Sequence, residues 1–146
     1  MTDKELFNFV KNKRGSISRD NCNRIINRSI QTIEIPSVSR IGAYAFRSCS
    51  SLTNVTIPNS VANVESDAFL NCINLENVTF EEDFQCSGLN LSASTKFSVD
   101  TMIAMFNALA DRTGSSAYTL TLGNTNLAKL NNEQIAIATE KNWTLA

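Results

Sequence analysis

The sequence predicts an α/β fold: a short solenoid with a parallel sheet, a helical amino-terminal cap and an α/β carboxy-terminal cap. Three observations predict it. Apolar residues recur with a period of 23, helix-start signals precede the repeats, and a helix–strand–helix–strand pattern follows them. The 146 residues fit one continuous domain, which we divide into residues 1–29, 30–86 and 87–146.

Residues 1–29 carry the signals of two short helices that would cover the open end of the first repeat. Thr2 and Glu5 have the spacing of a capping box, and Gly15 suits a helix end. We therefore expect a helix over residues 3–13 and a second one over residues 19–27.

The repeat becomes visible when residues 41–63 are aligned with residues 64–86. Identical or similar residues then coincide in the pairs Ile41 and Val64, Ala45 and Ala68, Phe46 and Phe69, Cys49 and Cys72, Leu52 and Leu75, and Val55 and Val78. A degenerate unit precedes them, because residues 30–36 echo residues 52–58 at a shift of 22. Such a period is typical of a solenoid, since one unit cannot bury its apolar side alone.

Each unit divides into a strand and a turn. Residues 54–57 alternate polar and apolar side chains, which predicts a strand with Val55 and Ile57 facing inward. Residues 41–46 suit a tight turn or a short helical piece. Stacking the units would build a parallel sheet, with phenylalanine and cysteine ladders in the core.

The spacing of apolar residues changes in residues 87–146. Ser98 is placed to cap a helix that runs to about Arg112, and residues 118–122 alternate as a strand with inward leucines. Asn131 begins a second capping box, and residues 143–145 form a last short strand. This region can serve as the cap that a solenoid needs. The sequence does not determine the path of residues 81–97.

The repeat motif resembles the BspA-type (Treponema pallidum-type) leucine-rich repeats of bacterial, protist and viral proteins. Its positions are Ile41, Gly42, Ala45, Phe46, Cys49, Leu52, Val55, Thr56, Ile57 and Pro58. The second copy departs from the pattern at Glu65 and Glu81, where the family has glycine and proline. Residues 87–146 are similar to the ending of bacterial and phage members. The resemblance implies a surface or secreted adhesion or recognition protein without catalytic activity.

The composition argues against several classes of function. The formal net charge is −1, whereas nucleic-acid-binding proteins usually carry a basic excess, so we expect no nucleic-acid partner. Histidine is absent, which removes the commonest general base and the commonest metal ligand. Phosphate-binding, zinc and serine-hydrolase motifs are also absent. We expect no enzyme, no cofactor and no metal site.

The cysteines and one acidic cluster invite chemistry but have plainer interpretations. The four cysteines are expected to be buried free thiols, because no CxxC pair occurs. Residues 81–83 form the one acidic cluster and are expected to be a solvated turn. No apolar segment reaches the ~18 residues of a membrane-spanning helix, so no membrane insertion is expected. The amino terminus lacks a signal-peptide pattern, which favours a virion-associated or cytoplasmic protein, or export by another route.

The outward positions of the predicted sheet indicate a candidate binding surface. They carry short polar side chains and comprise Thr32, Glu34, Asn54, Thr56, Asn77, Thr79 and Thr121. Such groups can bond to sugars or to protein backbone with little loss of side-chain entropy. The alternative interpretation is that threonine favours exposed strand positions in any protein.

The preferred function is a non-catalytic recognition or adhesion module that binds a protein or a cell-surface glycan through this face, on a bacterial surface or in a phage virion. The alternative is an intracellular scaffold or effector that uses the basic amino-terminal third, where residues 1–47 hold nine Lys and Arg against four Asp and Glu. An enzyme with an unrecognised site is the third hypothesis. The sequence predicts neither the ligand nor the oligomeric state.

Overall fold

The computed structural model describes residues 16–18 and 30–146. Its strands are β1 (Ser16–Ile17), β2 (Thr32–Glu34), β3 (Arg40–Ile41), β4 (Asn54–Ile57), β5 (Asn63–Val64), β6 (Asn77–Phe80), β7 (Tyr118–Leu120) and β8 (Trp143–Leu145). Its helices are α3 (Val99–Ala108), α4 (Asn124–Leu127) and α5 (Asn132–Thr139). Parallel strands followed by helices give the predicted α/β mixture. The helices expected over residues 3–13 and 19–27 lie outside the described residues.

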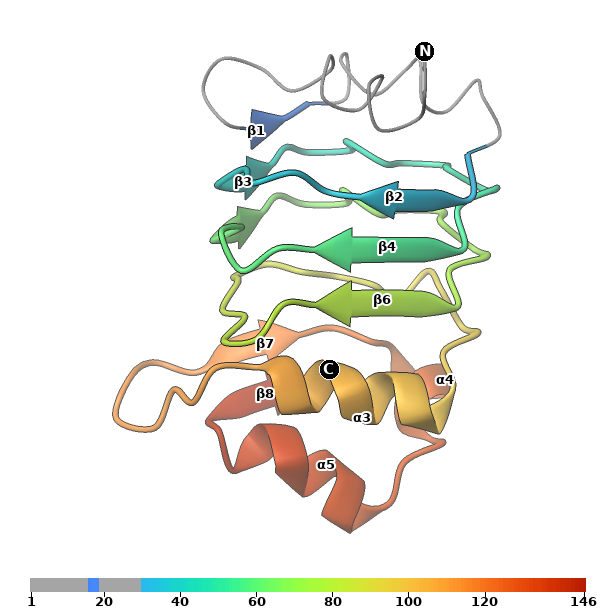
Figure 1. Ribbon diagram of the computed structural model, residues 1–146. Helices are drawn as coiled ribbons and strands as arrows, with labels where there is room; N and C mark the ends of the chain where they lie inside the picture. Colours follow the sequence, from blue (N-terminus) through green and yellow to red (C-terminus); the bar gives the residue numbers. More distant parts are fainter. Residues whose placement is uncertain (1–15, 19–29) are drawn as a thin grey trace.

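The front sheet consists of β2, β4 and β6, which lie side by side in this order (Figure 1). All pairs are parallel, and the register aligns Thr32 with Asn54 and Asn54 with Asn77. These alignments correspond to shifts of 22 and 23 residues. The repeat register predicted from the sequence is therefore confirmed.

A second parallel sheet, the back sheet, consists of β1, β3 and β5 and was not predicted. Each of its strands has two residues, too few to show an alternating pattern in the sequence. Ile17, Ile41 and Val64 are aligned and buried. Two isolated parallel bridges carry the pairing further, between Asn63 and Ser87 and between Asn90 and Thr121. The parallel pair of β7 and β8 follows.

Each repeat passes once through the front sheet and once through the back sheet, and we call this unit a coil. Residues 81–97, whose path the sequence does not determine, complete the coil that β6 begins. Phe84 pairs with Leu109 through a parallel bridge, and Ser87 then joins the back sheet. The Leu91 amide donates to the Thr121 carbonyl at 2.8 Å. The inward side chains of this segment are buried: Phe84, Leu89, Leu91 and Phe97.

The core lies between the two sheets and repeats from coil to coil. Phe46 stacks on Phe69 with ring centroids 5.2 Å apart and an angle of 16° between the planes, which confirms the predicted ladder. The prediction that the cysteines are buried and form no disulfide is confirmed for Cys49, Cys72 and Cys86, whereas Cys22 lies outside the described residues. Burial raises the pKa of the Cys86 thiol to about 12, so this thiol stays protonated at neutral pH.

The segment that leads from the back sheet to the front sheet consists of turns. Of the two structures predicted for residues 41–46, the tight turn is therefore the one observed. Tyr44 and Ser48 have φ values of 58° and 63°. Asp67 and Asn71, at the equivalent positions of the next coil, have φ values of 58° and 60°. The repeat therefore preserves a left-handed backbone conformation at two positions where the residue types differ.

Helix α3 begins as predicted and ends earlier. The Ser98 hydroxyl accepts a hydrogen bond from the Thr101 amide at 3.1 Å, which confirms the cap. The prediction that the helix reaches about Arg112 is wrong, because Leu109 is extended and bridges to Phe84. Parallel pairing thus replaces the helix after Ala108.

The remaining carboxy-terminal elements follow the predicted order, with one addition. Asn131 and Gln134 form the expected capping box of α5, and Asn142 has a left-handed φ of 63°. The short helix α4 was not predicted. Its Asn126 side chain is fully buried and donates to the carbonyls of Ser94 and Leu122 at 2.6 and 2.8 Å. Within the described ranges, no helix is long and apolar enough to cross a membrane.

Candidate binding surface

The front sheet positions six of the seven predicted site residues on one face. Strand alternation turns Ile33, Val55 and Val78 into the core, where each is at most 4% exposed. Their neighbours along each strand therefore point outward. They are Thr32 and Glu34 on β2, Asn54 and Thr56 on β4, and Asn77 and Thr79 on β6.

The first row of this face, at the start of the strands, is closed by hydrogen bonds within the protein. The Asn77 amide group donates to the Asn54 side-chain oxygen at 2.9 Å, and the Asn54 amide group lies 3.5 Å from the Thr32 hydroxyl. Beyond β6, the Thr101 hydroxyl of α3 donates to the Asn77 side-chain oxygen at 3.3 Å. These groups stabilise each other and have less capacity left for a ligand.

The second row, near the end of the strands, is open. Glu34 aligns with Thr56, and Thr56 aligns with Thr79. Throughout the part of the chain that the structure describes, no hydrogen bond involves the hydroxyl group of Thr56 or Thr79. Each hydroxyl can donate one hydrogen bond and accept two. A ligand can therefore bond to this row without breaking an existing contact.

Thr121 does not extend the column, and this part of the prediction is wrong. Thr121 follows β7 and pairs with Asn90, which connects it to the back sheet. The position next to β6 in the front sheet is taken by α3 instead (Figure 1). The sequence pattern shows that residues 118–122 form a strand, but it does not show which strand is the neighbour.

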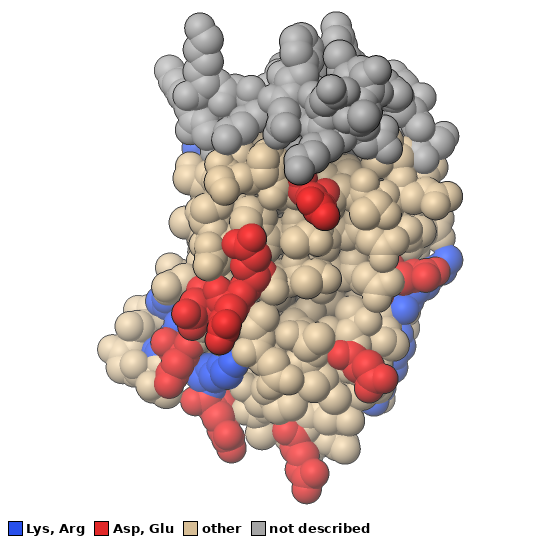
Figure 2. All heavy atoms as spheres, viewed as in Figure 1, with Lys and Arg blue, Asp and Glu red and all other residues tan. Residues whose placement is uncertain are grey.

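The charge around the front sheet is negative. Figure 2 shows this side of the molecule as a mostly uncharged surface with acidic side chains gathered on its left. Glu81, Glu82 and Asp83 follow the end of β6 and are exposed, as predicted for a solvated turn. Lys141 directs its ammonium group to three carbonyls at the end of α3, at 2.8–3.0 Å.

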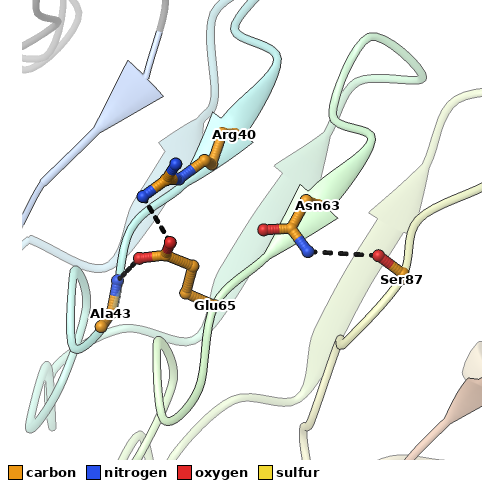
Figure 3. A network of polar contacts seen from close by, with 5 residues as sticks. All are labelled: Arg40, Ala43, Asn63, Glu65 and Ser87. Carbon is orange, nitrogen blue, oxygen red and sulfur yellow. Dashed lines mark hydrogen bonds and ion pairs between the residues drawn. The ribbon is translucent and has the colours of Figure 1, made fainter.

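Unlike the second row of the front sheet, the polar side chains of the back sheet shown in Figure 3 are paired with neighbouring groups. The Glu65 carboxylate forms an ion pair with Arg40 and accepts a hydrogen bond from the Ala43 amide at 2.9 Å. The Asn63 amide group donates to the Ser87 hydroxyl at 3.1 Å. Glu65, one of the two departures from the repeat pattern, therefore joins neighbouring coils.

The described residues offer hydrogen-bonding groups rather than a chemical centre. No cluster of three or more His, Cys, Asp or Glu side chains among them is placed to hold a metal ion. The three described thiols are buried. The arrangement of the front sheet is suited to binding, because its free hydroxyls form a regular row beside acidic groups.

Comparisons with known proteins identify the repeat. The model of the BspA type leucine rich repeat region matches residues 20–133, in six copies. A comparison with curated proteins finds no match. Among solved structures, the chain is similar to a leucine rich cell surface protein from Faecalibacterium prausnitzii, with 19% identity and a TM-score of 0.36. That match covers 80% of this chain and 32% of the other protein.

The family assignment rests on the repeat match alone. The matched range covers well over half of the 146 residues and continues past β6 into the helical region. The motif positions quoted above, the parallel register and the phenylalanine ladder agree with it. The chain belongs to the BspA-type leucine-rich repeat family.

Proposed function

We propose that this protein is a non-catalytic recognition module that binds a protein or a cell-surface glycan through the front sheet. The observation that carries the proposal is the open row of Thr56 and Thr79, whose hydroxyls point outward in register. Hydroxyl groups without a partner in the protein exchange only water for the ligand. A ligand that bonds to them therefore breaks no hydrogen bond within the protein.

A protein is the preferred class of ligand. Leucine-rich repeats generally mediate protein interactions, and a strand face with a regular backbone spacing suits another polypeptide. The similar solved protein is described as a cell surface protein. We place the module on a bacterial surface or in a phage virion, where recognition of a cell is the expected task.

We further propose that the coils form a short solenoid closed at both ends, by a helical amino-terminal cap and by residues 87–146. Met102, Met105 and Phe106 of α3 are buried against the coils. Deleting residues 98–146 should therefore expose the β6 edge and cause aggregation. Size-exclusion chromatography with light scattering checks this, and a soluble monomeric truncation would contradict the capping role.

The alternative function, an intracellular scaffold that uses the basic amino-terminal third, stays a prediction. Most of its basic residues lie outside the described ranges. Of the two described ones, Arg40 is paired with Glu65, and the Arg47 guanidinium lies 5.3 Å from the Tyr44 ring centroid. Neither contact favours an acidic partner.

The test of the proposed function is saturable binding of the labelled protein to intact cells and to a glycan array. The Thr56→Lys/Thr79→Lys variant should bind at least about tenfold more weakly, because two unpaired charges enter the interface. Ser39→Lys/Ala62→Lys is the matched control. It adds the same charge at exposed positions directly before β3 and β5, on the back sheet.

Two outcomes would contradict the proposal. One is equal loss of binding in both double variants, which would indicate a general charge effect. The other is undiminished binding of the Thr56→Lys/Thr79→Lys variant. An immunoblot of cytosol, envelope, medium and virus particles adds the location: protein found only in the cytosol would contradict recognition of a cell surface.

A further inference from the structure

The open row of the front sheet has a carboxylate at each end. Glu34 of β2 is exposed and aligns with Thr56, which aligns with Thr79. At the other end of the row, α3 lies beside β6 (Figure 1) and carries the exposed side chain of Asp100. The order across this face is therefore carboxylate, hydroxyl, hydroxyl, carboxylate.

A hollow of about 280 Å³ connects the row to α3, because Thr79 and Asp100 both line it. Together with Ala104, these residues are exposed. The inward residues of β6 and Met105 of α3 also line the hollow but are at most 6% exposed, so they close its base. A ligand in the hollow therefore rests on the outward side chains, while α3 stays packed against β6.

Both carboxylates are available to a ligand. Among the described residues, no hydrogen bond or ion pair involves the carboxylate of Glu34 or Asp100. The elements β2, β4, β6 and α3 contain no Lys or Arg. The exposed acidic residues 81–83 after β6 add to the negative potential of this side. The row thus offers oxygen atoms that accept hydrogen bonds and has no cation of its own.

The separation of the two carboxylates determines the length of a matching ligand. Neighbouring strands lie about 4.8 Å apart and a helix with its side chains is about 10 Å wide, so the carboxylates are on the order of 20 Å apart. An extended chain advances about 3.3 Å per residue, and every second side chain points to the same side. Two basic side chains six positions apart therefore reach both carboxylates from one side of such a chain.

We infer that the open row binds an extended segment of a protein partner that crosses the strands and carries two arginine residues six positions apart. One guanidinium group pairs with Glu34 and the other with Asp100, and polar groups between them bond to the threonine hydroxyls. Arginine fits better than lysine, because its planar guanidinium group donates two parallel hydrogen bonds to a carboxylate. The inference rests on the proposed function, since it specifies the chemistry of a protein partner at the same surface.

The test is a nuclear magnetic resonance titration of the intact, isotope-labelled protein with synthetic peptides. The probe has seven residues, with arginine at the first and last positions, five serines between them, and acetylated and amidated ends. We expect saturable binding with a Kd between about 0.1 and 5 mM, weakening as salt rises. The amide resonances of Glu34, Thr79 and Asp100 should shift with one common Kd. The same peptide with uncharged citrulline in place of arginine should bind about fivefold more weakly.

A peptide of the same composition tests the spacing. Its two arginines are adjacent at the centre, so they point to opposite sides of an extended chain and only one faces the sheet. It should bind about two- to fivefold more weakly than the probe. In Glu34→Gln or Asp100→Asn alone, the two peptides should bind equally, because one carboxylate remains. Equal affinity of both peptides for the wild type would overturn the inference.

Protein variants locate the contacts. Glu34→Gln/Asp100→Asn keeps the shape of both side chains and should weaken binding of the probe at least about fourfold. The matched control is Glu133→Gln/Glu140→Gln, which removes the same charge from exposed positions at α5 and should leave binding unchanged. Equal weakening in both double variants would indicate a general charge effect and overturn the inference. The absence of saturable binding to the wild type by about 5 mM would also overturn it.

The same variants separate this inference from the proposed function. Cell binding that is lost in Thr56→Lys/Thr79→Lys but retained in Glu34→Gln/Asp100→Asn would support the front sheet as the recognition face and overturn the arginine contacts. Peptide binding with the expected dependence on spacing, together with cell binding that the threonine variant leaves undiminished, would support the peptide site and overturn the proposed function in cell recognition.

Discussion

The front and back of the molecule continue differently past the third coil. At the back, parallel pairing passes from β5 through Ser87, Asn90 and Thr121 to β7 and β8. At the front, strand pairing stops at β6, and the helices α3 and α5 follow. One core is therefore covered by paired strands at the back and by helices at the front, and only the helices leave a strand edge unpaired.

The difference originates in the spacing of the inward residues. In β4 and β6 they alternate, and outward side chains stand in rows between them. In α3 the buried residues are Met102, Met105 and Phe106, which have helical spacing. A helix next to a strand leaves the strand edge unpaired, so strand pairing in the front sheet ends where the helix begins.

The largest expected effect tests whether the coils share one core. Phe69→Ala should reduce the free energy of unfolding by roughly 3–5 kcal/mol, because it removes the partner that stacks on Phe46 and leaves a cavity. Urea unfolding followed by circular dichroism measures it. Ile73→Ala is the control, since Ile73 is 53% exposed and should change stability by less than about 0.5 kcal/mol. A cost below about 1 kcal/mol for Phe69→Ala would contradict the ladder.

The matching test in the helical region is Phe106→Ala. Phe106 is fully buried, so a similar cost of roughly 3–5 kcal/mol is expected if α3 covers the same core. Each variant should unfold in one transition, as we expect of the wild type. A separate, earlier transition in Phe106→Ala would show that the two regions unfold independently and do not share one core.

A smaller effect is expected at Asn126, where a side chain joins two coils in place of backbone pairing. Asn126→Ala leaves the carbonyls of Ser94 and Leu122 without their donor, which should cost about 2 kcal/mol. The control is Thr125→Ala, an exposed neighbour on the same helix. Equal midpoints of urea unfolding for the two variants would show that the buried amide contributes little.

The thiol of Cys86 has the smallest effect near neutral pH, because it contributes only in alkaline solution. Below pH 9 this thiol is neutral in both the folded and the unfolded chain, so it does not affect stability. Between pH 9 and its folded-state pKa of about 12, only the unfolded chain ionises, and stability falls by up to about 1.4 kcal/mol per pH unit. Cys86→Ala should show a shallower alkaline loss by this amount. Parallel pH profiles for wild type and variant would contradict the shift.

The sequence predicts the front of the molecule better than the back. The strands at residues 54–57 and 77–80 were predicted because alternation and a fixed period act together on the same positions. The back-sheet strands have two residues each, too few for a pattern. The caps of α3 and α5 were predicted from single polar residues, but the end of α3 was not, because pairing between Phe84 and Leu109 determines it.

The candidate site was predicted in part for the same reason. Alternation determines which side chains point outward, so Thr56 and Thr79 could be named from the sequence. It does not determine strand neighbours, and Thr121 was misplaced for that reason. The end of the front sheet at β6 depends on a helix lying beside a strand, an arrangement that the spacing of neither element encodes.

Hydrogen exchange of the β6 amides tests whether strand pairing at the front stops at β6. The Thr79 amide faces β4 and should be protected, whereas the Val78 and Phe80 amides should exchange at least about a hundredfold faster. The measurement needs no ligand and compares neighbours on one strand. Slow exchange at all three positions would contradict the unpaired edge of β6, and with it the difference between the front and the back of the molecule.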